Sequence, residues 1–136
     1  MTPDQVSLVQ SSFAKVAPIA DTAAALFYDR LFTIAPPVKQ MFKGDMAEQG
    51  RKLMSMIGVA VANLGKLDVI VPAVRDLGRR HAGYGVRQAH YDTVATALVW
   101  TLEQGLGDDF TPATHQAWVE AYTILAGVMQ QAAATA

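Results

Sequence analysis

The sequence predicts a single all-α domain of seven or eight helices, with residues 1–136 as its bounds. Apolar residues recur at intervals of three and four along most of the chain, which is the period of an amphipathic helix. No useful length of sequence alternates apolar and polar residues, so no strand is predicted. Capping residues and prolines stand where helices would begin, and glycines or prolines where they would end.

The first predicted helix has a complete start signal. Thr2 is suited to the N-cap, Pro3 to the first helical position, and Gln5 closes a capping box. We expect this helix to stop near Pro18. Its apolar stripe consists of Val6, Val9, Phe13 and Val16.

A second helix is expected to be capped by Asp21 or Thr22 and to end at Pro36. A short helical turn over residues 38–42 and a loop over residues 43–45 follow. The next helix is long, about residues 47–64. The apolar positions of these two main helices are Leu26, Phe27, Leu31 and Ile34, then Leu53, Ile57, Val61 and Leu64.

A further helix begins near Asp68 and ends at Gly83 and Gly85, because glycine commonly terminates helices. Two long helices complete the chain. One covers residues 88–106 and is broken by the glycines and aspartates of residues 105–109. The other starts at residues 111–112 with a threonine cap and a proline, and the uncharged tail to residue 136 is typical of a helix end.

Composition excludes several function classes. A hydrophobic content of 51% against 17% charged residues exceeds what a simple bundle needs and suits a protein that encloses an apolar ligand. A net charge of −1 gives no basic face for nucleic acid or an anionic membrane. The absence of cysteine excludes disulfides, thiolate metal sites and a cysteine nucleophile.

Neither a signal peptide nor a membrane span is predicted. Polar residues interrupt the apolar positions near the N-terminus, and the longest charge-free apolar stretch, residues 53–65, is too short to cross a bilayer. We therefore expect a soluble, cytoplasmic protein that uses neither a membrane nor nucleic acid as a partner.

His81 is the first candidate functional residue. Leu77, Val74 and Ile70 precede it at helical spacing, so the imidazole shares their apolar, inward face. Taken alone, a histidine in this position is more often a hydrogen-bonded core residue than a metal ligand.

Four segments together resemble a globin. They are LFYDRLF at residues 26–32, MF at 41–42, QGRKLM at 49–54 and LGRRHAGYGVRQAHY at 77–91. The resemblance is to bacterial single-domain haemoglobins and to the haem domain of flavohaemoglobins, with a neuroglobin-like stretch at residues 77–81. It covers the whole chain and implies a globin fold around haem b (iron protoporphyrin IX).

On this resemblance His81 binds the haem iron through Nε2, while its other ring nitrogen donates to a backbone carbonyl near Leu77. Tyr28 and Gln49 match the distal pair that hydrogen-bonds to bound O2. Burying a hydroxyl or amide without a partner costs about 1–3 kcal/mol, and the ligand would supply that partner. In the alternative reading, Tyr28 bonds a backbone carbonyl and Gln49 faces water.

Other matches concern the walls of the haem site. Phe42 matches the aromatic ring that packs flat on the porphyrin, although an ordinary core phenylalanine remains an alternative. Leu53 would narrow the space beside the ligand. Gly50 would let its helix cross closely over Ala24. Further contacts of the cofactor are expected from Val86, Leu98 and Tyr91, with Lys52 and Arg80, and less so Arg51, as candidates for the propionates.

The proximal side departs from flavohaemoglobins in one respect. In that family a glutamate on the last helix completes a network with residues matching His81 and Tyr91, but residues 131–134 here are Gln-Ala-Ala-Ala. Tyr122 is left open between pocket and plain core. His90 and His115 lack partners at metal-ligand spacing, so they are expected to be solvated rather than to bind zinc.

Three functions follow, in order of preference. The first is reversible binding of O2, and of NO and CO, at haem iron. The second is NO dioxygenation, which would need a separate reductase because no reductase domain follows and no Gly-x-Gly-x-x-Gly stretch is present. The third is a haem-free interaction module. The sequence leaves open whether the protein is an enzyme and whether it is a monomer or a homodimer.

Overall fold

A computed structural model describes residues 1–134. Within that range there are six α-helices, four short 3-10 helices and no strand. The all-α prediction is therefore confirmed, although the number of α-helices is smaller than the seven or eight expected, because short segments adopt 3-10 turns. The helix end predicted for residues 135–136 lies outside the described residues.

The first helix, α1 (Pro3–Val16), begins as predicted. The Gln5 amide donates to Thr2 Oγ1 at 3.1 Å, and the Thr2 amide donates back to Gln5 Oε1 at 2.9 Å. A 3-10 turn, Ala17–Ile19, follows at Pro18. The capping box and the proline thus define both ends of this helix.

The predicted cap of the second helix is wrong. Helix α2 (Ala20–Ile34) starts directly after the 3-10 turn, and neither Asp21 nor Thr22 caps it. The reason is that the turn already supplies an acceptor: the Ala20 amide donates to the Ala17 carbonyl. No side-chain cap is needed where one helical segment continues into the next.

The middle of the chain differs from the prediction at its boundaries. The short helix is a 3-10 segment, Pro36–Met41. Helix α3 (Met46–Ala62) is capped by Asp45, whose Oδ1 accepts from the Ala47 amide at 2.9 Å, and it stops before Leu64, which belongs to the 3-10 turn Leu64–Lys66.

The bounds of the last three helices agree with those predicted from the sequence. Helix α4 (Leu67–Gly83) ends at Gly83, and α5 spans Gln88–Leu106 as predicted. A 3-10 turn, Gly107–Asp109, separates α5 from α6 (Pro112–Ala134). The Thr114 amide donates to Thr111 Oγ1 at 3.2 Å, which is the expected cap at the start of α6.

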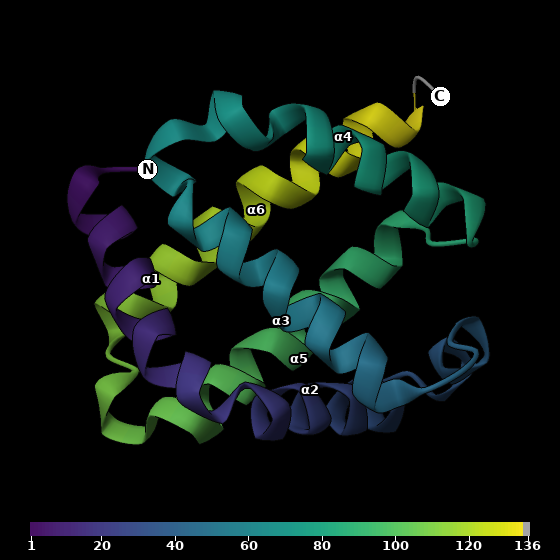
Figure 1. Cartoon of the computed structure of the whole chain (residues 1–136), viewed down its shortest axis with the longest axis horizontal. Helices are drawn as coiled ribbons and strands as arrows, with labels where there is room; N and C mark the ends of the chain where they lie inside the picture. The colour runs from purple at the N-terminus through teal and green to yellow at the C-terminus, as the bar shows by residue number, and fades with distance from the viewer. Residues whose placement is uncertain (135–136) are drawn as a thin grey trace.

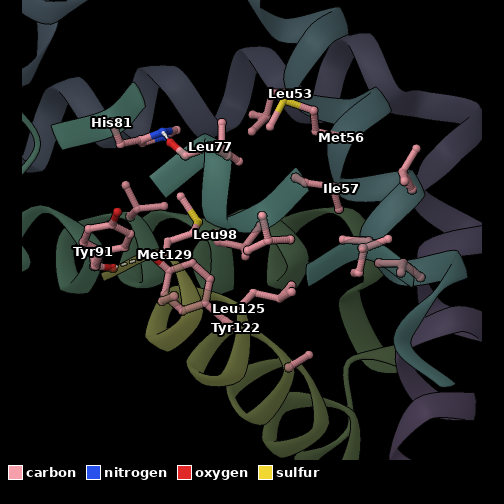
Figure 2. A pocket seen from close by; sticks show the side chains of 18 of the residues that line it. Leu53, Met56, Ile57, Leu77, His81, Tyr91, Leu98, Tyr122, Leu125 and Met129 are labelled. Carbon is pink, nitrogen blue, oxygen red and sulfur yellow. Dashed lines mark hydrogen bonds between the residues drawn. The ribbon is translucent and has the colours of Figure 1, made fainter. Parts of the chain in front are cut away.

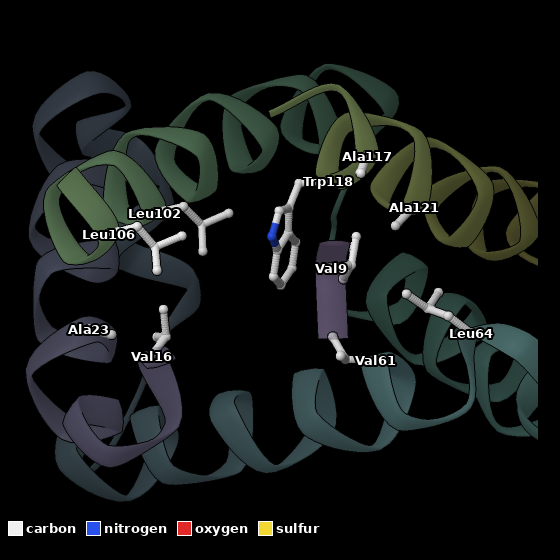
Figure 3. Close-up of a cluster of buried hydrophobic side chains, with 10 residues drawn as sticks. All are labelled: Val9, Val16, Ala23, Val61, Leu64, Leu102, Leu106, Ala117, Trp118 and Ala121. Carbon is white, nitrogen blue, oxygen red and sulfur yellow. The ribbon is translucent and has the colours of Figure 1, made fainter. Parts of the chain in front are cut away.

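The helices cross rather than run parallel. Helix α4 packs on α6, while α2 packs on α3 and α5, so that α4 and α2 occupy opposite edges of the molecule (Figure 1). Figure 3 shows the larger core cluster, in which Trp118 lies among the aliphatic side chains. The buried Trp118 Nε1 donates to Ser12 Oγ at 2.8 Å, so its polar atom is satisfied inside the core.

A second core cluster contains four aromatic residues. Its buried members come from α2, the 3-10 segment after it, and α5: Phe27, Tyr28, Leu31, Val38 and Ala97. Phe32, Phe42 and Leu53 pack against them. Two separate clusters leave a boundary between them, and that boundary is where the site lies.

Within residues 1–134, no single helix is both long and apolar enough to cross a bilayer. The pair Met46–Ala62 and Leu64–Gly83, bent by 57°, could do so by length and composition only.

Candidate functional site

A cavity of about 420 Å³ lies between α3, α4, α5 and α6, where the two core clusters meet. Figure 2 shows its walls: Leu53, Met56 and Ile57 from α3, Leu77 and His81 from α4, Tyr91 and Leu98 from α5, and Tyr122, Leu125 and Met129 from α6. Its size is within the usual range of small-molecule sites, and its lining is mainly apolar. Such a cavity suits a large apolar ligand.

His81 is a polar group in this wall. The stripe predicted behind it is present, because Ile70, Val74 and Leu77 line the same cavity. His81 Nδ1 lies 2.7 Å from the Leu77 carbonyl oxygen, which can only accept, so Nδ1 carries the proton and donates. This is the hydrogen bond that the resemblance implies. It fixes the ring and leaves Nε2 with a lone pair for a metal.

Tyr28 and Gln49 come together beside the cavity rather than in its wall. Burial raises the pKa of the Tyr28 phenol, and a hydrogen bond with the Gln49 side chain opposes that rise. The phenol therefore keeps its proton at neutral pH. Gln49 is half-buried and acts on the Tyr28 phenol, while the role of the two residues toward a ligand stays a prediction.

An aromatic group surrounds the Tyr28 ring. The ring centroid lies 5.3 Å from that of Phe42 and 5.9 Å from that of Phe32. Phe42 is outside the cavity wall, so its predicted contact with a porphyrin stays a prediction. Phe27 and Leu53 belong to the same core cluster as Tyr28 and also line the cavity, so they connect the aromatic group to it.

The predicted close crossing at Gly50 is confirmed. A Cβ placed on Gly50 would lie 2.9 Å from Ala24 Cβ, closer than side chains normally approach. Helices α2 and α3 can therefore cross at this point only with glycine on one of them. Since Tyr28 is one turn after Ala24 and Gln49 precedes Gly50, the crossing brings the two polar side chains together.

The remaining predicted contacts divide into two groups. Val86, Tyr91, Leu98 and Arg80 line the cavity. Lys52 does not: its ammonium is exposed and 3.6 Å from Glu48 one turn away. Arg51 is also exposed.

The sequence left open whether Tyr122 faces the pocket or belongs to the plain core. Its side chain lines the cavity. Its hydroxyl donates to the Tyr91 carbonyl at 2.7 Å, joining α6 to the first turn of α5 (Figure 2). Burial is the main cause that raises the pKa of Tyr122, with smaller contributions from Tyr91 and Asp92. Burial also raises the pKa of Tyr91.

The comparison with known proteins now decides the family. A model of the globin family matches residues 25–129, more than three quarters of the chain. The chain belongs to the globin family.

Relatives of this globin differ in length. The flavohemoprotein of Xylella fastidiosa strain Temecula1 is 29% identical over 132 residues, covering 95% of this chain and 33% of the relative. That of Bacillus subtilis strain 168 is 29% identical over 126 residues, covering 89% and 31%. This globin therefore spans about a third of the length of these flavohemoproteins.

Two other similar proteins have nearly the same length as this globin. An anaerobic nitrite reductase of Oryza sativa subsp. indica is 29% identical over 133 residues and is covered to 92%. A solved structure, an engineered carbene transferase made from a putative nitric oxide dioxygenase of Rhodothermus marinus, superposes with a TM-score of 0.89 at 26% identity over 99% of this chain and 94% of that one.

Membership of the globin family implies haem binding, and the cavity fits that group. Two imidazoles line it, and that of His81 has a tautomer that leaves Nε2 with a free lone pair, in a wall that is otherwise mostly apolar. A structural zinc site would need about four ligands, and no cluster of three His, Cys, Asp or Glu side chains capable of holding a metal occurs in residues 1–134. The donor set suits a metal already held by a macrocycle.

Two features of this globin were missed from sequence. His90, expected to be solvated, lines the cavity and accepts the Arg87 amide proton at Nδ1, at 2.8 Å; His115 is exposed, as expected. Gly78 was not singled out, although a Cβ there would lie 2.6 Å from Met129 Cα. A glycine inside a helix was the available signal, as it had been for Gly50.

Proposed function

We propose that this globin binds haem b and, through it, reversibly binds O2 and other diatomic ligands. The observation that carries the proposal is His81, held by the Leu77 carbonyl with Nε2 free in an otherwise mainly apolar cavity. The absence of cysteine supports non-covalent haem, since thioether attachment requires cysteines. We take the whole of residues 1–136 as the globin domain.

The residues that line the cavity would have different roles in holding the haem. Haem iron, when bound, supplies the position at which O2, CO and NO coordinate. His81 would hold the iron from one side, and its hydrogen bond to Leu77 keeps the ring from rotating. Leu53, Leu98 and Val86 would exclude water from the macrocycle. Arg80 would contact a propionate, and the exposed Lys52 remains a weaker candidate for the same task.

Tyr28 and Gln49 would stabilise bound O2. Tyr28 is buried and Gln49 is half-buried, and each has a hydrogen that it can donate. A hydrogen bond between them would keep both groups paired when no ligand is present, which would avoid the cost of an unpaired buried polar group. A ligand carrying partial negative charge would attract both donors.

Tyr28→Phe should speed O2 dissociation about 10- to 100-fold, because a hydrogen bond to a charged acceptor contributes about 1.5–3 kcal/mol. Stopped-flow displacement of O2 by CO measures this rate. Tyr84→Phe is the matched control, since Tyr84 is 68% exposed. If the Tyr28 variant released O2 at the wild-type rate, Tyr28 would have no part in holding the ligand.

NO dioxygenation is the second candidate, and the similarity to a structure titled as a putative nitric oxide dioxygenase favours it. It would use the same residues and a separate reductase as partner. Nitrate formation from NO and O2 in the presence of a generic reductase, compared with free haem at equal concentration, tests it. Turnover no faster than that of free haem would argue against a dioxygenase.

A further inference from the structure

We infer that His90 binds a carboxylate at the polar edge of the macrocycle, by donating a hydrogen bond from Nε2. This inference rests on the proposed haem binding and adds a ligand-anchoring residue that the resemblance does not supply. It predicts that recognition depends on the free carboxylates of the ligand and not on its apolar ring alone.

The tautomer of His90 is determined by its backbone contact. The Arg87 amide donates to His90 Nδ1 at 2.8 Å. A ring nitrogen that accepts this hydrogen carries no proton of its own, so in the neutral ring the proton is on Nε2. Within residues 1–134, no hydrogen-bond partner is found for Nε2. His90 therefore offers one free donor.

His90 lies in the wall of the cavity that would hold the ligand. His90 is half-buried and lines the cavity from the first turn of α5. Its neighbour Tyr91 lies at the same end of the cavity as His81, away from Met56 and Ile57 (Figure 2). Because Arg80 also lines the cavity and precedes His81, the cationic and donor groups gather at this end.

Groups of both signs lie near this end, with Arg80 paired to Asp76 and with Asp92 acting on Tyr122. Arg80 Nε is 3.3 Å from Asp76, an exposed pair that partly offsets the arginine charge, so Arg80 alone is a weakened anchor. The first turn of α5 contains no acidic residue, and the N-terminal end of a helix attracts negative charge. A carboxylate beside His90 would thus gain a hydrogen bond and meet a favourable dipole.

The test compares haem with haem dimethyl ester, whose two carboxylates are blocked. The variant is His90→Glu, because glutamate at this helix position can still accept the Arg87 amide proton, as in a capping box, while it repels a carboxylate. We expect haem to dissociate about tenfold faster from His90→Glu than from wild type, with transfer to excess apomyoglobin as the measurement. Dissociation of the dimethyl ester should be unchanged.

Two further variants complete the experiment. His90→Gln keeps the cap without adding charge and should give a smaller acceleration, again for haem only. His115→Glu, at an exposed histidine of α6, should change neither rate. Circular dichroism and the urea midpoint of each apoprotein report whether α5 is intact.

The outcomes separate this inference from the proposed function. A wild-type protein that binds neither compound would refute haem binding itself. Wild-type binding with equal haem dissociation from His90→Glu and wild type would overturn the role of His90. Equal acceleration of haem and ester would overturn it too, since it would show a structural effect only. Acceleration confined to haem supports the inference.

Discussion

Replacing His81 with glycine should lower haem affinity at least about 100-fold and change the visible spectrum of any haem that remains. Residues that only orient a metal ligand alter metal affinity about 10–100-fold, so loss of the ligand itself should exceed that. The side chain is half-buried in the cavity wall and makes one hydrogen bond, to the Leu77 carbonyl. Haem titration of the apoprotein, followed by absorbance, measures the affinity.

The control for this experiment restores the missing ring from solution. Free imidazole should enter the space left in His81→Gly and return the wild-type spectrum, because the cavity wall around it is unchanged. Wild-type affinity and spectrum in His81→Gly without imidazole would mean that iron is held elsewhere. His115→Gly, far less buried, should behave as wild type.

The second large effect is on stability. Gly78→Ala should lower the free energy of unfolding by about 1–3 kcal/mol, the usual cost of overpacking. Its Cβ would lie 2.6 Å from Met129 Cα and 2.8 Å from Met129 C, and would contact the Met129 carbonyl oxygen more closely still. All three are backbone atoms, so α4 and α6 would have to separate. Urea denaturation of the apoprotein measures the loss.

A glycine-to-alanine substitution at a more open position should raise the free energy of unfolding. A Cβ on Gly127, within α6, would meet nothing within 4 Å. Gly127→Ala should therefore stabilise the protein by about 0.5–1 kcal/mol, the ordinary advantage of alanine over glycine in a helix. If Gly78→Ala and Gly127→Ala had equal urea midpoints, α4 and α6 would not be packed as closely at Gly78 as the structure shows.

Gly78→Ala should also disturb the site, because His81 is one turn further along α4. A helix displaced from α6 would move the imidazole relative to the opposite wall. We expect weaker haem binding in this variant than in Gly127→Ala.

Local signals account for most of the fold that could be predicted. Thr2, Pro112 and Gly107 each act within one turn of the chain, so the sequence around them suffices to place a helix end. The wrongly predicted helix cap at Asp21 and the wrongly predicted helix end at Leu64 have the same origin. In both places a 3-10 turn joins two helices, and periodicity alone does not distinguish such a turn from a continuing helix or a loop.

The candidate site was predicted less completely. His81 could be found because its own helix carries the apolar stripe that lines the cavity. Tyr122 could not be assigned, since its partner, the Tyr91 carbonyl, is 31 residues away. His90 was misjudged because its place in the cavity wall depends on how α5 packs against α6, and no local pattern encodes that packing.

The central claim is that His81 anchors haem in this cavity, and the absorption spectrum of the purified protein tests it most directly. We expect a Soret band in the ferric protein that sharpens and shifts when dithionite and CO are added, with about one haem per chain. A protein that remains colourless after incubation with haem, or whose bound haem gives the same CO spectrum as free haem, would contradict the claim.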